Sequence, residues 1–256
     1  MTDLLRSEFF KLRTLRLNYI LLAIGFVFVV LIMGLIGIFA DVEGSSTPSS
    51  DIADIIGTTA ILPGLLISVI GVLAISSEFA HGTIRPTLVA TPSRPKVFLA
   101  KAIVLVVVAF VSAVVIAIVG YLVGYAFLSS RGAEELTLFD GDGTLGVLLV
   151  GLPILFVLLV LFGYGLGLLI RSSPAAVSLA ILWPILIETI VAGSLTVAGV
   201  DDAGKFLPYQ SALVLVSSDP SGSDFAYGKV GGAAFFGVVV LALVGLAVAV
   251  NNKRDV

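Results

Sequence analysis

Residue types that commonly build chemical sites are absent or scarce in this sequence. The 256 residues include no cysteine and a single histidine, His81, which excludes disulfides, thiolate metal sites and clusters of histidine ligands. Charged residues make up only 12% of the chain, and the formal net charge of -3 is too small to indicate a partner. The sequence also lacks an HExxH motif and a Gly-x-Ser-x-Gly nucleophile elbow. We therefore expect no enzyme activity, no cofactor, no metal and no nucleic-acid partner.

The abundant residues indicate an integral membrane protein. Hydrophobic residues make up 59% of the chain and the mean hydropathy is +1.18, whereas apolar residues usually make up roughly half of a soluble domain. The longest polar stretches are about 30 residues, which is below the usual domain minimum of about 50. We expect an all-α protein that forms a single transmembrane domain, residues 1–256, without a separate soluble domain.

Six apolar runs are long enough to cross a hydrocarbon core of roughly 30 Å. The first, from Tyr19 to Ala40, is not expected to be a cleaved signal peptide, because it is too long and has no A-x-A pattern at its end. Pro63 and Gly64 are expected to kink the second run. The third run exceeds what a bilayer needs, so its first turns should project into water. The expected spans are about 19–40, 55–75, 97–128, 146–170, 175–199 and 230–250.

The amino-terminal residues 1–18 have an amphipathic pattern. Their apolar side chains fall within about 60° on a helical wheel, and these are Leu5, Phe9 and Leu12. Arg6 and Arg13 lie on another side of the wheel. The pattern predicts a helix on the membrane surface with its basic residues near lipid phosphates. The alternative is an ordinary basic flank of the first span.

The charged residues divide unequally between the two sides of a six-span chain. Of the 14 Lys and Arg residues, 11 fall on the side of the termini, and 12 of the 17 acidic residues fall in the three loops of the other side. The first of these acidic loops is expected from Asp41 to Asp54. By the positive-inside rule, both termini and the loop from Ser76 to Lys101 are cytoplasmic, in a multi-pass protein of the cytoplasmic membrane.

The loop from Ser76 to Lys101 is the longest polar stretch with a net positive charge. Thr83 is expected to cap a short surface helix, which ends before Pro92. Ser93 is the expected cap of the third span. The loop therefore predicts a short cytoplasmic helix held between two membrane helices.

That short helix has the features of a docking element. Ile84 and Leu88 lie one helical turn apart, and Arg85 lies beside them. Such an arrangement suits an apolar groove with an acidic rim on a soluble partner. The alternative is a basic loop that rests on anionic lipid.

Glu188 is the one carboxylate inside an expected span. An ionisable group at that depth costs at least about 2.5 kcal/mol, so Glu188 is expected either to act in function or to be paired in an architectural role. The sequence leaves both open. Glycines within the spans, such as Gly163 and Gly167, are expected to allow close helix packing.

Two stretches on the other side require a separate interpretation. The segment from Phe206 to Val216 is too short to cross and too apolar for a free loop, so we expect a short re-entrant or interfacial helix. The segment from Gly199 to Phe206, GVDDAGKF, matches a phosphate-binding loop until Phe206 replaces the Ser or Thr that holds magnesium. Its position outside the cytoplasm also argues against a nucleotide site.

Two motifs resemble those of the ABC-2 type permease subunits of bacterial ABC transporters. The first is a Glu before a Lys-Leu-Arg cluster, and the second combines Glu-aromatic, Gly-Thr-Ile-Arg and Pro-Ser-Arg with a Lys ahead of the third span. The matching residues are Glu8, Lys11, Leu12, Arg13, Glu78, Phe79, Gly82, Thr83, Ile84, Arg85, Pro92, Ser93, Arg94 and Lys101. Beyond residue 101 the resemblance rests on the six-span layout.

The resemblance implies a type V exporter-like fold. Such a fold has an amino-terminal connecting helix, a cytoplasmic coupling helix between spans two and three, and short outer helices before span six. It also implies ATP hydrolysis by a separate soluble ABC ATPase subunit and a pathway formed with a second permease copy, identical or homologous. The residues expected to couple to the ATPase are Glu78, Gly82, Thr83, Ile84, Arg85, Leu88 and Arg94.

The resulting functional hypothesis is the permease subunit of an ABC exporter whose substrate the sequence does not reveal. Its partners are the ATPase subunit, the second permease copy, membrane lipids and that substrate. Two alternatives stay open at this point. One is a secondary transporter driven by protons through Glu188, and the other is a membrane scaffold or sensor that transports nothing.

Overall fold

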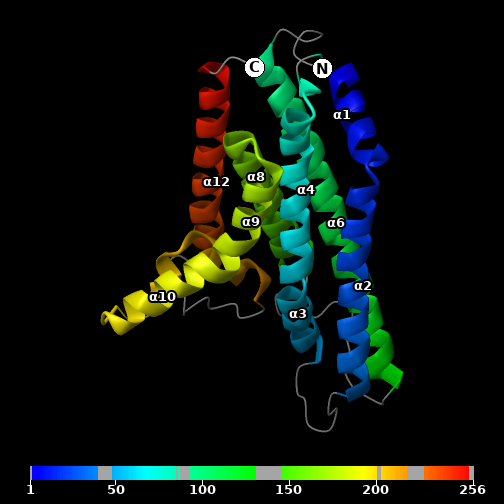
Figure 1. Cartoon of the computed structure of the whole chain (residues 1–256). Coiled ribbons are helices and arrows are strands. Elements are labelled where there is room, and N and C mark those ends of the chain that lie inside the picture. Colours follow the sequence, from blue (N-terminus) through cyan, green and yellow to red (C-terminus); the bar gives the residue numbers. More distant parts are fainter. Residues whose placement is uncertain are drawn as a thin grey trace.

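A computed structural model shows the fold of the chain and describes residues 2–39, 48–84, 86, 93–130, 146–200, 203–217 and 228–253. The described residues form helices and short connections, without any strand (Figure 1). The elements in chain order are α1 (Thr2–Thr14), α2 (Arg16–Phe39), α3 (Pro48–Thr59), α4 (Ile61–Ala80), α6 (Arg94–Ser130), η1 (Val147–Gly151), α8 (Leu152–Ile170), α9 (Ser173–Leu182), η2 (Trp183–Ile187), α10 (Glu188–Val197), η3 (Ala203–Phe206), α11 (Pro208–Ala212), η4 (Leu213–Val216) and α12 (Gly228–Lys253).

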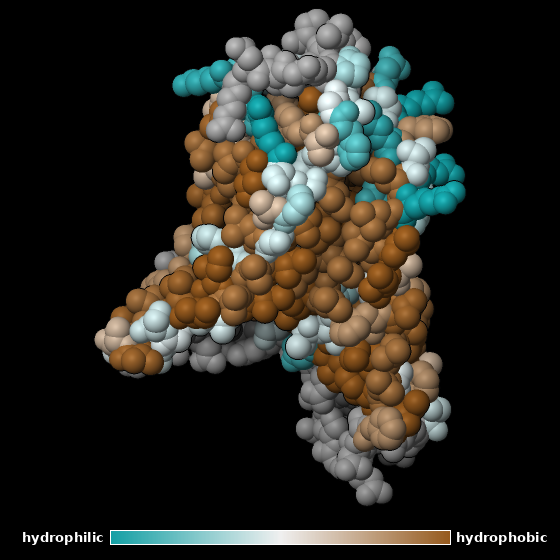
Figure 2. All heavy atoms as spheres, viewed as in Figure 1, coloured by the Kyte–Doolittle hydropathy of each residue, from teal (hydrophilic) through white to brown (hydrophobic). Residues whose placement is uncertain are grey.

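Six helical stretches are long and apolar enough to cross a membrane, and each overlaps one expected span. Figure 2 shows hydrophobic residues over the middle of the molecule and most hydrophilic residues at the end that holds α1. The expectation of an all-helical protein with six membrane-spanning helices is thus confirmed. The stretches are Arg16–Phe39, Ile52–Ala80, Pro95–Phe127, Val147–Ile170, Ser173–Val197 and Gly228–Lys253.

The second stretch begins earlier than the sequence suggested. Residues from Pro48 onward are helical in α3, so the expectation of a loop as far as Asp54 was wrong. Helix α3 ends at Thr59 and α4 begins at Ile61, just before Pro63. Because proline has no N–H and its ring clashes with the carbonyl four residues earlier, the interruption lies where a proline kink is expected.

Helices α4 and α8 form the centre of the bundle. In each, 67% of the residues in the most apolar stretch are buried, against 17–22% for α2, α9–α10 and α12. The two central helices touch through glycine: a Cβ atom added at Gly163 would lie 2.0 Å from the Ser68 carbonyl oxygen, and one at Gly71 would lie 2.2 Å from that of Val160. The packing role expected for Gly163 therefore holds, because only glycine permits this backbone approach.

The fifth stretch bends in its middle. Helix α9 changes at Trp183 to the π-helical turn η2, which contains Pro184, and α10 then leans away from the bundle (Figure 1). Proline and π-helical turns are both common causes of a kink. Most apolar side chains of α10, including those of Ile190 and Val197, are exposed.

The segment from Phe206 to Val216 does not form one re-entrant helix. It contains the end of η3 and the short elements α11 and η4, which pack against α8 and α12. Tyr209 and Val214 are buried. Short helical elements thus precede the sixth spanning helix in the chain and contact it.

Candidate functional site: a buried charge cluster

The amino-terminal start of α1 and the carboxy-terminal end of α12 lie at the same end of the bundle (Figure 1). The end of α4 and the beginning of α6 lie there as well. The turn between α8 and α9 joins them, because its Arg171 contacts Phe79 of α4 and Asn251 of α12. The segments that carry most of the lysines and arginines are therefore gathered at one end.

Four charged residues from three helices meet at this end, and we call them the charge cluster: Glu8 and Lys11 of α1, Glu78 of α4 and Lys101 of α6. The Lys101 ammonium donates to both glutamates, at 3.0 Å to Glu78 Oε1 and at short range to Glu8 Oε2. The Lys11 ammonium also donates to both, at 2.7 Å to Glu8 Oε1 and 3.1 Å to Glu78 Oε1. Two cations and two anions thus form a closed network that joins residues up to 93 positions apart.

Three members of the charge cluster are withdrawn from solvent. Glu8 is 1% exposed, Lys101 is 3% exposed and Glu78 is 9% exposed. Burial by itself would raise the pKa of the Glu8 carboxyl, but Lys101 and Lys11 outweigh it and hold that pKa below its ordinary value of 4.5. Burial would lower the pKa of Lys11, whereas Glu8 and Glu78 raise it above 10.5. Both groups are therefore charged near neutral pH.

The expected coupling residues begin with Glu78, and the turn at Gly82 and Thr83 follows it. Gly82 has φ +68 and follows the end of α4, with its N–H 3.3 Å from the Phe79 carbonyl oxygen. This left-handed conformation favours glycine, as at many helix carboxyl ends. Thr83 is exposed, and its hydroxyl lies 3.5 Å from the Glu78 carbonyl oxygen. A cavity of about 390 Å³ opens here, lined in part by Lys11, Glu78, Thr83 and Lys101.

The other expected coupling residues are placed differently or lie outside the description. Ile84 is 1% exposed, so its side chain packs within the subunit and is not presented to a partner in this conformation. Arg85 and Leu88 lie outside the described residues. Arg94 begins α6 after Ser93, whose carbonyl accepts from the Lys96 N–H at 3.1 Å, and the Arg94 side chain is outside the described part of the chain.

Two more contacts fix the end of α4. The hydroxyls of Ser76 and Ser173 lie 2.9 Å apart and join α4 to the start of α9. The Arg171 guanidinium lies 4.7 Å from the centre of the Phe79 ring and donates from Nε to Asn251 Oδ1 at 2.9 Å. The last turn of α4 is therefore tied to four other helices, α1, α6, α9 and α12, either directly or through the Arg171 turn.

Comparison with known families identifies this architecture. The family model described as ABC-2 family transporter protein matches residues 4–196, three quarters of the chain. The chain belongs to the ABC-2 transporter family. This ABC-2 type permease is therefore a membrane permease of an ABC transporter. No curated protein sequence matches the chain.

The remaining carboxylate of interest in the permease, Glu188, has a different kind of environment. Its Oε1 accepts from Trp183 Nε1 and from the Tyr209 N–H, both at 3.0 Å, and its Oε2 accepts from the Gln210 N–H at 3.0 Å. Tyr209 and Gln210 are in the first turn of α11, whose N–H groups have no partner within the helix. The 2% exposed Glu188 thus caps α11 across the bend of the fifth stretch. These contacts favour the architectural alternative.

In the permease, the segment GVDDAGKF is not flanked by the strand and long helix that flank a phosphate-binding loop, as far as the described residues show. Gly199 and Val200 follow the end of α10, and Ala203–Phe206 forms the 3-10 turn η3, which leads into the five-residue helix α11. A phosphate-binding loop joins a strand to a long helix, and the described residues contain no strand. Asp201 and Asp202 lie outside the described residues.

Sequence reasoning found all four members of the charge cluster but not their association. Glu8, Lys11, Glu78 and Lys101 all belong to the two family motifs, yet nothing in either motif says that they touch. The sequence did contain one signal. Two lysines and two glutamates lie close to the ends of membrane spans, and their four charges sum to zero. Lys101 also lies where water was expected around the first turns of α6, and its burial against α1 shows that this expectation was wrong for that face.

Proposed function

We propose that this permease exports its substrate across the cytoplasmic membrane, driven by ATP hydrolysis in a separate soluble ABC ATPase subunit. Two permease copies, identical or homologous, form the pathway. The ATPase docks on the segment between α4 and α6, which acts as the coupling helix. The observation that carries this proposal is the charge cluster, because it connects the base of that segment to both α1 and α6.

The end that holds the charge cluster is the cytoplasmic one in this proposal. The segments gathered there account for 11 of the 14 Lys and Arg residues in the sequence, and such segments favour the cytoplasmic side. Both termini are then cytoplasmic, and α1 is the connecting helix on the inner surface. The short elements from η3 to η4 belong to the opposite side.

The contacts around Glu78 suggest how movement of a docked ATPase reaches the membrane helices. Glu78 is one residue from Phe79 and four residues before Gly82, so a displacement of the coupling segment acts first on the last turn of α4. Lys101 is buried and contacts both Glu78 and Glu8. A shift of α4 must therefore move α1 and α6 with it or break a buried ion pair, which typically costs several kcal/mol.

Each proposed coupling residue has its own role in this scheme. Glu78 transmits the displacement, Gly82 and Thr83 form the turn, and Ile84 anchors the segment from inside the subunit. Arg85, Leu88 and Arg94 provide the contacts with the ATPase. Glu188 shapes the permease without a direct part in the transport cycle.

Pull-down of the ATPase with a tagged permease, together with ATP hydrolysis by the complex in proteoliposomes, tests the docking. Leu88→Asp is expected to reduce co-purification strongly, because it places a carboxylate in an apolar contact. Arg85→Lys is expected to do partial harm, since it keeps the charge but loses the guanidinium fork. Undiminished co-purification and normal hydrolysis with Leu88→Asp would rule the docking out.

Two glycine variants distinguish a specific role of the coupling turn from general damage to the fold. Gly82→Val forces a β-branched residue to φ +68 and is expected to impair ATP hydrolysis by the complex while the permease still reaches the membrane. Gly146→Val is the control, since Gly146 has φ -62 and, like Gly82, would place a Cβ with no atom within 4 Å. Equal behaviour of the two variants would contradict a role for the turn.

A further inference from the structure

An apolar groove lies in the elbow between α1 and α2, and residues of α4 and α6 form its floor. Its volume is about 270 Å³, and it is lined by Phe9, Leu12, Arg13, Asn18, Tyr19, Leu22, Ile70 and Val108. Sites for drug-sized ligands usually measure roughly 300 to 1,000 Å³. The groove therefore has room for part of a slender chain and little more.

One side-chain hydrogen bond joins the two helices of the elbow that forms the groove. Leu15 separates α1 from α2, and the Asn18 side chain donates from Nδ2 to the Leu12 carbonyl oxygen at 3.0 Å. Asn18 is 6% exposed, so this bond is shielded from water. The bond uses the Asn18 amide to satisfy the end of α1, which leaves Arg13 and Tyr19 as the polar groups that a ligand can reach.

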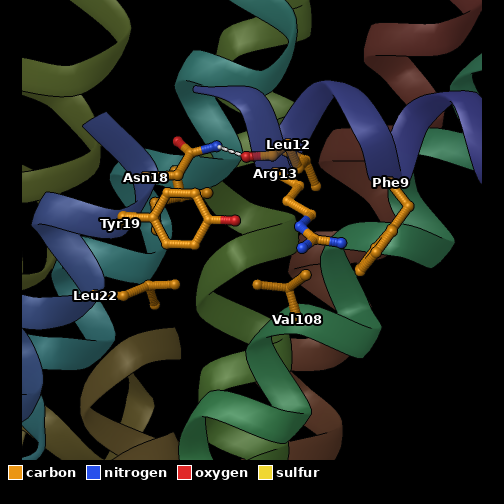
Figure 3. Close-up of a pocket in the computed structure, with 8 residues that line it drawn as sticks. Phe9, Leu12, Arg13, Asn18, Tyr19, Leu22 and Val108 are labelled. Atoms are coloured by element: carbon orange, nitrogen blue, oxygen red, sulfur yellow. Dashed lines mark hydrogen bonds between the residues drawn. The ribbon is translucent and has the colours of Figure 1, made fainter. Parts of the chain in front are cut away.

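Arg13 and Tyr19 face one another across the mouth of the groove. Figure 3 shows the Tyr19 hydroxyl pointing toward the Arg13 guanidinium, with Leu22 and Val108 below them in the view. Both residues are exposed, and no ion pair among the described residues includes Arg13. The mouth thus presents one positive charge and one hydroxyl above an apolar channel.

The depth of the groove corresponds to the boundary between headgroups and hydrocarbon. Arg13 lies just before α2 enters its apolar stretch at Arg16. Ile70, on the floor, is ten residues before the end of α4, or about 15 Å along a helix. The positive mouth is therefore at the headgroup level and the apolar floor is within the acyl chains.

We propose that the groove binds one anionic phospholipid, with its phosphate between Arg13 and Tyr19 and one acyl chain between Leu22 and Val108. A guanidinium pairs well with phosphate, and basic sites at the cytoplasmic ends of membrane helices favour anionic headgroups. Because Leu12 lines both this groove and the cavity beside the charge cluster, the lipid holds α1 in the position where Glu8 reaches Lys101. This inference does not depend on which subunit hydrolyses ATP.

Native mass spectrometry and thermal unfolding of the purified full-length permease in detergent test the proposal. The probes are phosphatidylglycerol and, as the zwitterionic reference, phosphatidylcholine with the same acyl chains. We expect one phosphatidylglycerol molecule to be retained, and the unfolding temperature to rise more with it than with phosphatidylcholine. Equal retention and equal stabilisation by the two lipids would overturn the proposal.

Matched variants assign the binding to the groove. Arg13→Gln should weaken phosphatidylglycerol binding roughly tenfold or more, since one charge-assisted bond is lost. Arg6→Gln removes the same charge from the same helix outside the groove and should change binding by less than about twofold. Equal weakening by Arg13→Gln and Arg6→Gln would mean a general basic surface and would overturn the proposal.

Two further variants test the channel and the hydroxyl. Tyr19→Phe keeps the ring and should weaken phosphatidylglycerol binding without loss of folding, because the hydroxyl contact with the phosphate is lost. Val108→Trp should fill the channel, displace the retained lipid and leave the unfolding temperature insensitive to phosphatidylglycerol. Retention of the lipid by a folded Val108→Trp variant would contradict the site, as would a second permease copy found in place of the lipid at the groove.

Discussion

The buried carboxylates toward the two ends of the permease are stabilised by different kinds of partner. At the end that holds the termini, Glu8 and Glu78 share the ammonium groups of Lys11 and Lys101. Toward the other end, Glu188 accepts three N–H groups and contacts no cation among the described residues. One site is an ionic network and the other is a helix cap.

The kind of partner limits how each carboxylate site can rearrange. Backbone N–H groups are fixed by the helix that carries them, so the Glu188 cap holds one arrangement of α10 and α11. A lysine ammonium has three rotatable donors on a flexible stem, and each lysine here already contacts both glutamates. The charge cluster can therefore exchange one ion pair for another while it stays neutral, whereas the Glu188 cap cannot.

The largest expected effect comes from removal of the central cation. Lys101→Met leaves the 1% exposed Glu8 with only Lys11, and loss of one partner of a buried pair typically costs about 3–5 kcal/mol. We expect a strongly lowered unfolding temperature for the purified permease. The double variant Glu8→Gln with Lys101→Met should recover much of the loss, because it removes the unpaired charge.

Lys96→Met is the matched control for Lys101→Met. Lys96 is exposed near the start of the same helix, so its loss should cost less than about 1 kcal/mol. If both single variants unfold alike, or if the double variant is no more stable than Lys101→Met, the cluster is not the network described above.

The cap at Glu188 should respond to shape and hydrogen bonding more than to charge. Glu188→Leu leaves the N–H groups of Tyr209 and Gln210 without an acceptor, at a cost of roughly 1–3 kcal/mol each when buried. Glu188→Gln keeps one carbonyl oxygen and should lower the unfolding temperature less. ATP hydrolysis by the complex should stay near normal in Glu188→Gln, and its loss in a stably folded Gln variant would make Glu188 a functional residue.

A smaller effect is expected at Arg171, a cation that pairs with a neutral side chain at the same end as the charge cluster. Arg171→Lys keeps the charge but loses the planar contact with Phe79 and the two-point contact with Asn251. We expect a loss of about 1 kcal/mol in thermal unfolding. Arg16→Lys, at an exposed position at the start of α2, serves as the reference, and an equal loss there would remove the assigned role from Arg171.

The smallest effect is expected from pH near neutrality. The lowered pKa of Glu8 gives stability that is present above about 4.5 and is lost as pH falls through the folded value. The raised pKa of Lys11 gives stability that is present below 10.5 and is lost as pH rises through the folded value. The difference in unfolding temperature between wild type and the Glu8→Gln, Lys101→Met double variant should therefore be flat between roughly pH 6 and 9. A step centred near pH 7 would contradict the assigned charges.

Local sequence features determined much of the fold. A run of about 20 apolar residues is sufficient to define a membrane helix, so all six spanning helices could be predicted without knowledge of their neighbours. The boundary at Ser93 and the interruption near Pro63 also followed from single residues, because caps and prolines act on the backbone beside them. The family followed from two short motifs.

Only the tertiary structure decided which of these residues meet. Glu8 and Lys101 are 93 positions apart, and their contact depends on how three helices pack, which no local pattern encodes. The same holds for Glu188, whose donors come from a short helix across a bend, and for Ile84. The helical period places Ile84 and Leu88 on one face, but it cannot tell whether that face meets a partner or the subunit's own core. For Ile84 the packing of neighbouring helices decided in favour of the core.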